Sequence, residues 1–219
     1  MGADDFNLGA YFGKINLMNL REMLFIRGIK SLIARYFKTR KSFGFIAQSS
    51  VVTPPVTLSG GENINISDDV NIGANSLMYA THATITIKKG FVAATGLKLI
   101  TGGHERRVGH FLYSITDAEK DLTKNLDRNI IIEEDVWAGM DVMILRGCTI
   151  GRGCTLAARS VVTKSTPPYS IVGGVPAQFI KFYWTVDEIL EHEKILYPED
   201  KRYTREYLEE LFCQYVETK

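Results

Sequence analysis

Three histidines are the side chains of this sequence best suited to proton transfer at neutral pH. His82, His104 and His110 lie close together along the chain. An imidazole titrates near pH 6.5, and as a general base it speeds the reaction of a hydroxyl by about 10²–10⁴-fold. Three histidines can also bind zinc, but their spacings of 22 and six residues and the absence of an evident acidic second shell disfavour a metal site.

The three cysteines predict packing rather than chemistry. Their odd number argues against a disulfide framework. Cys148 and Cys154 are six residues apart, which places them on different faces of the fold inferred below, and Cys213 falls in a predicted C-terminal helix. We expect all three to be buried apolar side chains.

A six-residue repeat between Ile130 and Pro168 must position the residues that carry chemistry. One column of the repeat is Ile132, Ala138, Ile144, Ile150, Leu156 and Val162. A second column, two residues earlier, is Ile130, Val136, Val142, Cys148, Cys154 and Ser160. Helices repeat near 3.6 residues and simple strands near two, so neither explains the pattern. Short strands joined by tight corners, wound as a three-faced prism with coils about 4.8 Å apart, satisfy both columns.

The same repeat extends towards the N-terminus with two interruptions. Its earlier pairs are Ile64/Ile66, Val70/Ile72, Ser76/Met78, Ile85/Ile87, Phe91/Ala93 and Leu97/Leu99. The nine-residue step from Met78 to Ile87 predicts a bulged corner at residues 80–83. The repeat then stops at Leu99 and resumes at Ile130, and the excursion loop of residues 101–129 is of a length that is usually functional.

The flanking segments predict helices and set the domain boundaries. Residues 1–50 form an N-terminal segment with a basic amphipathic helix at about 19–40, which either packs on the protein or binds an anionic membrane surface. Residues 51–183 form the β-helix domain. Within it, an irregular connection at 52–55 precedes the six-residue repeat, and Pro and Gly pairs beyond Val162 end the solenoid. Residues 184–219 form two helices capped by Thr185 and Thr204, and His192 is expected to be solvated.

The composition narrows the partners and the location. With 26 basic and 25 acidic residues, the net charge of +1 gives no electrostatic case for nucleic acid. No apolar run reaches the roughly 18 residues of a membrane span, and the N-terminus lacks a signal-peptide pattern. A cytoplasmic location is therefore expected.

Five short motifs occur in an order that resembles a known family. They are Gly102–His104, Val136–Gly139, Ile150–Gly151, Ser160–Lys164 and Gly173–Ala177. Over about residues 64–183 the chain resembles the hexapeptide-repeat O-acetyltransferases of the maltose, galactoside and nodulation group. It also resembles the xenobiotic acetyltransferases, which modify antibiotics and carry longer C-terminal helices, as this chain does.

The resemblance implies a mainly β fold, a left-handed parallel β-helix, in a homotrimer with acetyl-CoA in the groove between adjacent solenoids. His104 on the excursion loop corresponds to the general base for the acceptor hydroxyl. The backbone N–H of Met140 corresponds to the donor for the oxyanion.

The resemblance also implies binding residues. Those for CoA are Ala158, Thr163, Lys164 and Lys181, together with Arg159, which replaces a family glycine and either adds a phosphate contact or constrains the groove. Those for the acceptor are Tyr79, Thr81, His82 and Trp137, although Trp137 could instead pack at the trimer interface. Tyr79 and Thr81 belong to a Tyr-Ala-Thr sequence where galactoside acetyltransferases have Tyr-Ala-Asn.

The predicted function is acetyl-CoA-dependent O-acetylation of a saccharide hydroxyl, including that of a surface-polysaccharide precursor, with no metal. Three alternatives stay open. They are acetylation of an antibiotic, a zinc lyase like the γ-class carbonic anhydrases, and a trimeric scaffold without catalysis.

Overall fold

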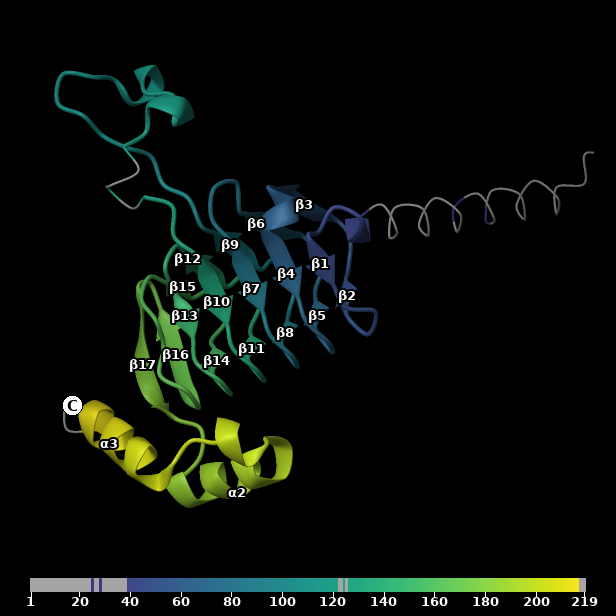
Figure 1. The fold of residues 1–219 in the computed structure, drawn as a ribbon, viewed down its shortest axis with the longest axis vertical. Helices are drawn as coiled ribbons and strands as arrows, with labels where there is room; N and C mark the ends of the chain where they lie inside the picture. The colour runs from purple at the N-terminus through teal and green to yellow at the C-terminus, as the bar shows by residue number, and fades with distance from the viewer. Residues whose placement is uncertain (1–24, 26–27, 29–38, 122–123, 125, 217–219) are drawn as a thin grey trace, which may run out of the picture. The chain divides into compact units, whose positions relative to one another are not determined.

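Three sheets wind around one axis to form a left-handed parallel β-helix (Figure 1). This computed structural model describes residues 25, 28, 39–121, 124 and 126–216. The first face comprises β1 (Phe45–Ile46), β4 (Ile64–Ile66), β7 (Ile85–Ile87), β10 (Ile130–Ile132) and β13 (Thr149–Ile150). The second comprises β2 (Val51–Val52), β5 (Asn71–Ile72), β8 (Val92–Ala93), β11 (Trp137–Ala138), β14 (Thr155–Leu156), β16 (Ser170–Gly174) and β17 (Ala177–Phe182). The third comprises β3 (Val56–Ser59), β6 (Ser76–Tyr79), β9 (Lys98–Ile100), β12 (Met143–Leu145) and β15 (Val161–Val162).

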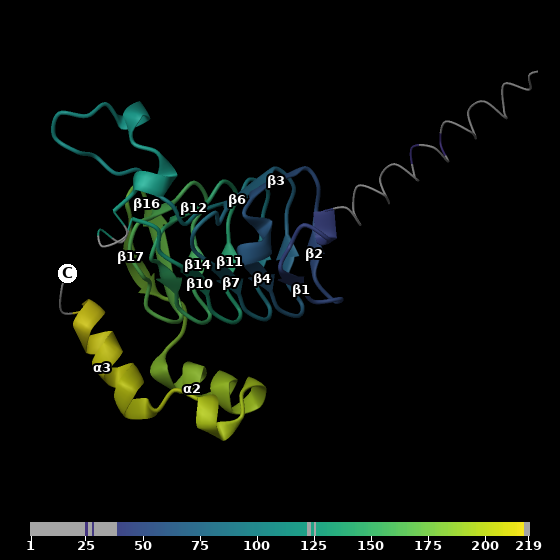
Figure 2. The ribbon, with the colours of Figure 1, turned by 45° about the horizontal axis from the view of Figure 1, so that its top comes forward.

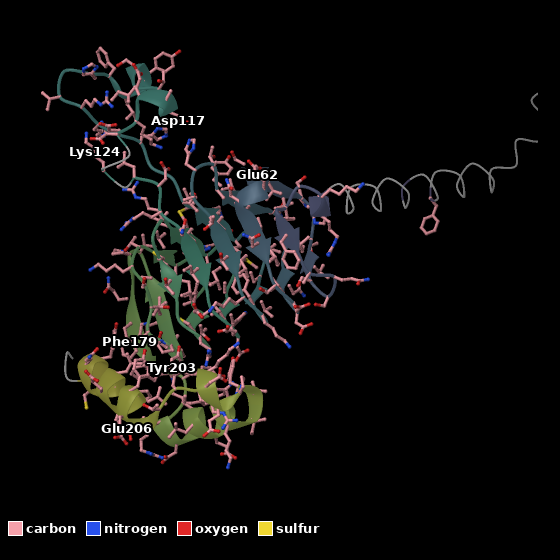
Figure 3. The ribbon with its side chains drawn as sticks, viewed as in Figure 1. Glu62, Asp117, Lys124, Phe179, Tyr203 and Glu206 are labelled. Carbon is pink, nitrogen blue, oxygen red and sulfur yellow. The ribbon has the colours of Figure 1, made fainter. Side chains whose placement is uncertain are left out.

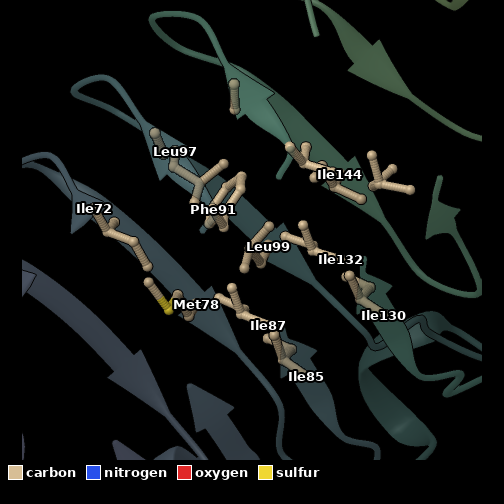
Figure 4. Packing of buried hydrophobic residues seen from close by; sticks show 14 of the residues in the cluster. Ile72, Met78, Ile85, Ile87, Phe91, Leu97, Leu99, Ile130, Ile132 and Ile144 are labelled. Atoms are coloured by element: carbon tan, nitrogen blue, oxygen red, sulfur yellow. The ribbon is translucent and has the colours of Figure 1, made fainter. Parts of the chain in front are cut away.

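The aliphatic columns fill the interior of the prism, as the repeat predicts (Figure 4). The parallel register pairs Ile132 with Ile150, Ala138 with Leu156, and Ile144 with Val162. Every residue of both columns is buried. Burying an aliphatic side chain of this size contributes about 1.5–3 kcal/mol, so the stacked columns supply the main stabilisation of the coils.

Two kinds of corner separate the faces. From the first to the second face, and from the second to the third, the step between core residues is always six, as from Ile66 to Ile72 and from Ile72 to Met78. Polar residues in the left-handed backbone region turn several of these corners, among them Asp69, Asn75 and Asp141. The corner from the third face to the first varies in length, and we call it the variable corner. It contains η2 (Gly61–Asn63), the predicted bulge after Met78 and the whole excursion loop.

The solenoid starts earlier and ends differently than the sequence predicts. Its first coil runs from β1 to β3, so Val52 belongs to a strand and residues 53–55 form a corner rather than an irregular connection. At the other end, β16 still pairs with β14 in parallel. The chain then reverses into β17, which pairs with β16 in antiparallel. The Gly and Pro residues at 173–176 therefore form a hairpin.

The two predicted C-terminal helices are confirmed as α2 (Val186–Leu196) and α3 (Arg205–Val216), separated by η6 (Glu199–Lys201). Thr185 and Glu188 form the predicted capping box. A buried ionic contact docks α2 on the coils, because Arg152 donates to both carboxylate oxygens of Glu193, at 3.0 and 2.9 Å, and the hydroxyl of Tyr169 donates to the same group at 2.6 Å.

Two predictions about single side chains in these helices are wrong. His192 is half-buried rather than solvated, since its ring packs 4.6 Å from that of Trp184. Cys213 is exposed, whereas Cys148 and Cys154 are buried as predicted, and burial raises the pKa of both buried thiols. Residues 19–38 of the predicted basic helix lie outside the described residues, apart from Phe25 and Gly28, so its role stays a prediction.

The excursion loop projects from the coils in both views (Figures 1 and 2). It contains two short helical turns, η3 (Leu112–Ser114) and η4 (Asp117–Glu119). After it, β10 pairs with β7 in the register Ile130 to Ile85, so the coil stack continues unchanged. No helix in the described part of the chain is both long and apolar enough to cross a membrane.

Candidate active site

His104 and three of the predicted acceptor residues line one depression at the variable corner. Its walls come from β6, the end of β9 and the excursion loop. The lining residues are Tyr79, Thr81, His82, Ile100, Thr101, Gly102, Gly103, His104, Asp117, Lys120 and Asp127. The exposed side chain of His104 forms no hydrogen bond with the described residues, so both of its ring nitrogens are open to a ligand.

Three charged residues of this depression were not predicted from the sequence. His82 Nε2 lies 3.5 Å from Asp117 Oδ2, and this contact holds the pKa of Asp117 below its usual value. Lys120 is almost buried and lies 2.8 Å from Asp127 and 3.6 Å from Asp117. These pairs tie η4 to the corner at His82 and to the returning end of the loop. Figure 3 labels Asp117 and Lys124 in this loop. Only the folded loop brings them together, so no repeat or motif marked them.

A buried carboxylate anchors the loop directly after His104. The side chain of Glu105 is 1% exposed. It accepts hydrogen bonds from Arg107 at 2.7 and 3.0 Å, from the Asp121 N–H at 2.7 Å, and from the Lys124 ammonium. Bonding to Arg107, then to Asp121 and Lys124, holds the pKa of Glu105 far below its usual value. The outgoing and returning parts of the loop are therefore joined beside the candidate base.

Two further depressions continue along the variable corner from the one at His104. The middle one is lined by Ile100, Gly102, Arg128, Leu145, Arg146 and Thr163, and it shares Ile100 and Gly102 with the first. The last is lined by Val162, Lys164, Ser165, Thr166, Pro167, Val172, Ala177, Gln178, Phe179 and Tyr215. The predicted CoA residues Thr163 and Lys164 thus lie on the same corner as His104, two coils further along the solenoid.

The remaining predicted residues lie elsewhere on the same chain. Met140, Ala158 and Arg159 form the corner between the second and third faces, where the Arg159 N–H donates to the Met140 carbonyl at 2.7 Å. The N–H groups of Met140 and Ala158 have no partner among the described residues. Lys181 is exposed on β17.

Trp137 also lies away from His104 within one chain. Its exposed ring is on β11 of the second face, in a depression lined by Asp135, Trp137, Gly153, Thr155, Tyr183 and Trp184. A single chain therefore presents the predicted site in two parts. One lies at the variable corner, and the other lies on the second face and on the corner between the second and third faces.

The described residues contain no group of three or more His, Cys, Asp or Glu side chains placed to hold a metal ion within one chain. His82 and His104 line the same depression, but the exposed His110 does not line it.

Comparisons with known proteins match the repeat and most of the chain. Residues 129–164 match the family model described as bacterial transferase hexapeptide (six repeats). The galactoside O-acetyltransferase of Escherichia coli (strain K12) is 30% identical over 165 residues, 74% of this chain and 71% of that protein. A chloramphenicol acetyltransferase of Klebsiella aerogenes is 48% identical over 61 residues, which span only 28% of this chain and 29% of that protein.

A solved structure extends the similarity to a protein with bound cofactor. The hexapeptide-repeat acetyltransferase of Vibrio cholerae O1 biovar eltor, complexed with acetyl coenzyme A, aligns with a TM-score of 0.58 at 31% identity. The alignment covers 70% of this chain and 78% of that one.

Proposed function

Since the chain belongs to the hexapeptide-repeat acetyltransferase family and is an acetyl-CoA-dependent acetyltransferase, we propose that it acetylates a saccharide hydroxyl with His104 as general base. The saccharide is supported by the similarity to a galactoside O-acetyltransferase. A surface-polysaccharide precursor is one form that such an acceptor takes. We propose no metal in this reaction, and we propose a cytoplasmic location.

The proposed reaction needs one proton acceptor and one hydrogen-bond donor. His104 takes the proton of the acceptor hydroxyl as its oxygen attacks the thioester carbonyl carbon. The resulting oxyanion accepts a hydrogen bond from the unpaired N–H of Met140. When the C–S bond breaks, the imidazolium returns its proton to the CoA sulfur, and the products are the acetyl ester and free CoA.

A homotrimer would join the two parts of the site. We propose that the variable corner of one subunit, with His104, Thr163 and Lys164, faces Met140 and Ala158 of the next. Trp137, Arg159 and Lys181 of that next subunit then complete the acceptor and CoA sites. Val108, Phe111 and Tyr113 of the excursion loop are almost fully exposed in one chain, and a neighbouring subunit would cover this apolar surface.

The observation that carries this proposal is the exposed, unbonded His104 in a depression continuous with the predicted CoA residues. We expect His104→Ala to keep the trimer and the acetyl-CoA Kd but to lose at least about 10²-fold in kcat, measured by CoA release. His110→Ala is the matched control, because His110 is exposed on the same loop and does not line the depression. Comparable kcat in His104→Ala and wild type would overturn the assignment.

The acceptor class is tested with a panel of sugars, nucleotide sugars and antibiotics. Acetylation of an antibiotic, the second candidate, is favoured by the 48% identical stretch shared with a chloramphenicol acetyltransferase. Turnover of chloramphenicol but of no sugar would favour that activity. Tightly bound zinc at about one per subunit would instead support a lyase, and no acetyl-CoA binding in calorimetry would support a scaffold.

A further inference from the structure

Two arginines line the middle depression without a counter-ion. Arg128 and Arg146, which we call the arginine pair, form no ion pair with the described residues. The one hydrogen bond between them is from Arg128 Nη2 to the backbone oxygen of Arg146, at 3.5 Å. A guanidinium stays charged at any physiological pH, so two of them beside one depression favour the binding of an anion.

Close packing on glycines places both arginines. Arg146 Nη1 lies so near Gly103 that a Cβ at this glycine would overlap it. Arg128 lies against Gly147, where an added Cβ would be 2.8 Å from the guanidinium carbon. Gly103 directly precedes His104, so the Arg146 guanidinium is held next to the backbone that carries the candidate base.

The nearby carboxylates are committed to other cations. Asp127 pairs with Lys120 at 2.8 Å, and Asp117 contacts His82 at 3.5 Å. Glu105 is bound by Arg107 and Lys124. The described part of the chain therefore supplies no anion to the arginine pair, which leaves both guanidinium groups open to an anionic ligand.

An extended CoA places its phosphates beyond the arginine pair. About a dozen bonds separate the thioester sulfur from the first phosphate, an extended reach of roughly 15 Å. Coils are about 4.8 Å apart, so Arg146 on the next coil is about 5 Å along the axis from the coil of His104. Lys164 follows one coil later and the β16–β17 hairpin after that, at roughly 10–15 Å. CoA phosphates therefore fall near Lys164 rather than at the arginine pair.

We propose that the arginine pair binds an anionic group of the acceptor, a phosphate or a carboxylate, adjacent to the hydroxyl that is acetylated. This inference rests on the proposed function, since it takes His104 as the base and the variable corner as the path of CoA. One coil, about 5 Å, separates the anion from the reacting oxygen. The sugar residue that bears the acetylated hydroxyl therefore also carries the anion, either as a carboxylate or as a directly attached phosphate. The hydroxyl of Thr163 supplies a further donor in the same depression.

The test compares each neutral sugar with its charged counterpart as acceptor. The probes are galactose, galactose 1-phosphate and galacturonate, with the glucose and N-acetylglucosamine counterparts, and kcat/KM is measured by CoA release. We expect a charged member to exceed its neutral parent by at least about tenfold, because charge-assisted hydrogen bonds are lost with the neutral sugar. Equal or better kcat/KM for every neutral parent would overturn the proposal.

Variants of the arginine pair must remove this preference. In Arg146→Gln and in Arg128→Gln the ratio of charged to neutral kcat/KM should fall at least about fivefold. Arg106→Gln is the matched control, since it removes the same charge from an exposed residue that does not line the depression. Arg128 is exposed, so its variant keeps the test valid where Arg146→Gln fails to fold.

Binding measurements separate this proposal from the proposed function. A tenfold or larger rise in the acetyl-CoA Kd of Arg146→Gln would assign the anion to CoA and overturn the inference. If no sugar is acetylated, the proposed function fails. Titration of galactose 1-phosphate and galacturonate into CoA-saturated protein then still tests whether the arginine pair binds an anionic sugar. Binding that is lost in Arg128→Gln supports the arginine pair, and no binding to the wild type overturns it.

Discussion

Arg159 shows how a single residue can carry both strain and function. Its φ of 60° lies in the left-handed region, where a side chain other than glycine costs about 1–2 kcal/mol. This explains why the resemblance places a glycine at the position. An arginine at this corner is less stable than a glycine would be. We therefore expect its long exposed side chain to contribute to CoA binding.

Replacing Arg159 tests that role at the scale of the residue. We expect Arg159→Gly to raise Tm by about 2–4 °C, because relief of the strain exceeds the backbone entropy of glycine by up to about 1 kcal/mol. Loss of a phosphate contact should raise the acetyl-CoA Kd about threefold or more. Arg159→Ala is the control, since it removes the charge but keeps the strain. A higher Tm in Arg159→Gly with unchanged Kd in both variants would contradict a CoA contact.

The positions of the candidate site residues were predictable from the sequence where the repeat or a short motif determines the backbone. His104 follows directly from a coil, and Thr163 and Lys164 end one, so the order of coils alone places them along one corner. Asp117, Lys120 and Arg128 lie in the excursion loop, where no periodicity relates sequence position to place. Arg146 sits on a regular coil, but its importance depends on the loop residues that leave it without a counter-ion.

At the scale of elements, the Glu105 anchor predicts how the excursion loop responds to pH. The pKa of Glu105 is lowered in the folded protein, so the stabilisation it contributes is fully present above the unfolded value, near 4.3. It is lost only as pH falls through the lower folded value. The loop of the wild type should therefore stay protected from hydrogen exchange at pH 5 and at pH 4.

Glu105→Gln should open the excursion loop at pH 7 as well as at pH 5 and pH 4. The amide cannot balance Arg107 and Lys124, so exchange of loop amides should rise at least about tenfold at pH 7, with kcat reduced and the acetyl-CoA Kd unchanged. Glu105→Asp keeps the charge and should restore part of the protection. Loop protection in Glu105→Gln equal to that of the wild type would show that the anchor is dispensable.

The strands were predicted well where buried side chains follow the six-residue repeat. The paired columns from Ile64 to Val162 predicted the order and register of the coils they span, because each residue has a partner one coil away. The first coil was missed because its core positions, Ile46, Val52 and Leu58, are interrupted by two prolines. The terminal hairpin was missed because its strand β16 stacks like a coil while β17 reverses direction.

At the scale of the whole molecule, the split site predicts complementation between inactive subunits. His104→Ala removes the base at the variable corner, and Trp137→Ala removes a predicted acceptor contact on the second face. In a one-to-one mixed trimer, about a quarter of the interfaces pair the two intact halves, so kcat should recover to about a quarter of wild type. Light scattering of the wild type should first show three subunits. A mixture no more active than its components would place each site within one subunit.

The three corners of the β-helix differ in how far their length can change. Two corners of every coil keep a step of six, and any added residue there would shift a core column out of the prism. The variable corner accepts steps such as that from Leu58 to Ile66, from Met78 to Ile87 and from Leu99 to Ile132, and the stack continues in register after each one. Insertions there leave the core columns in register, so the loops that line the His104 depression can change in length while the β-helix scaffold stays constant.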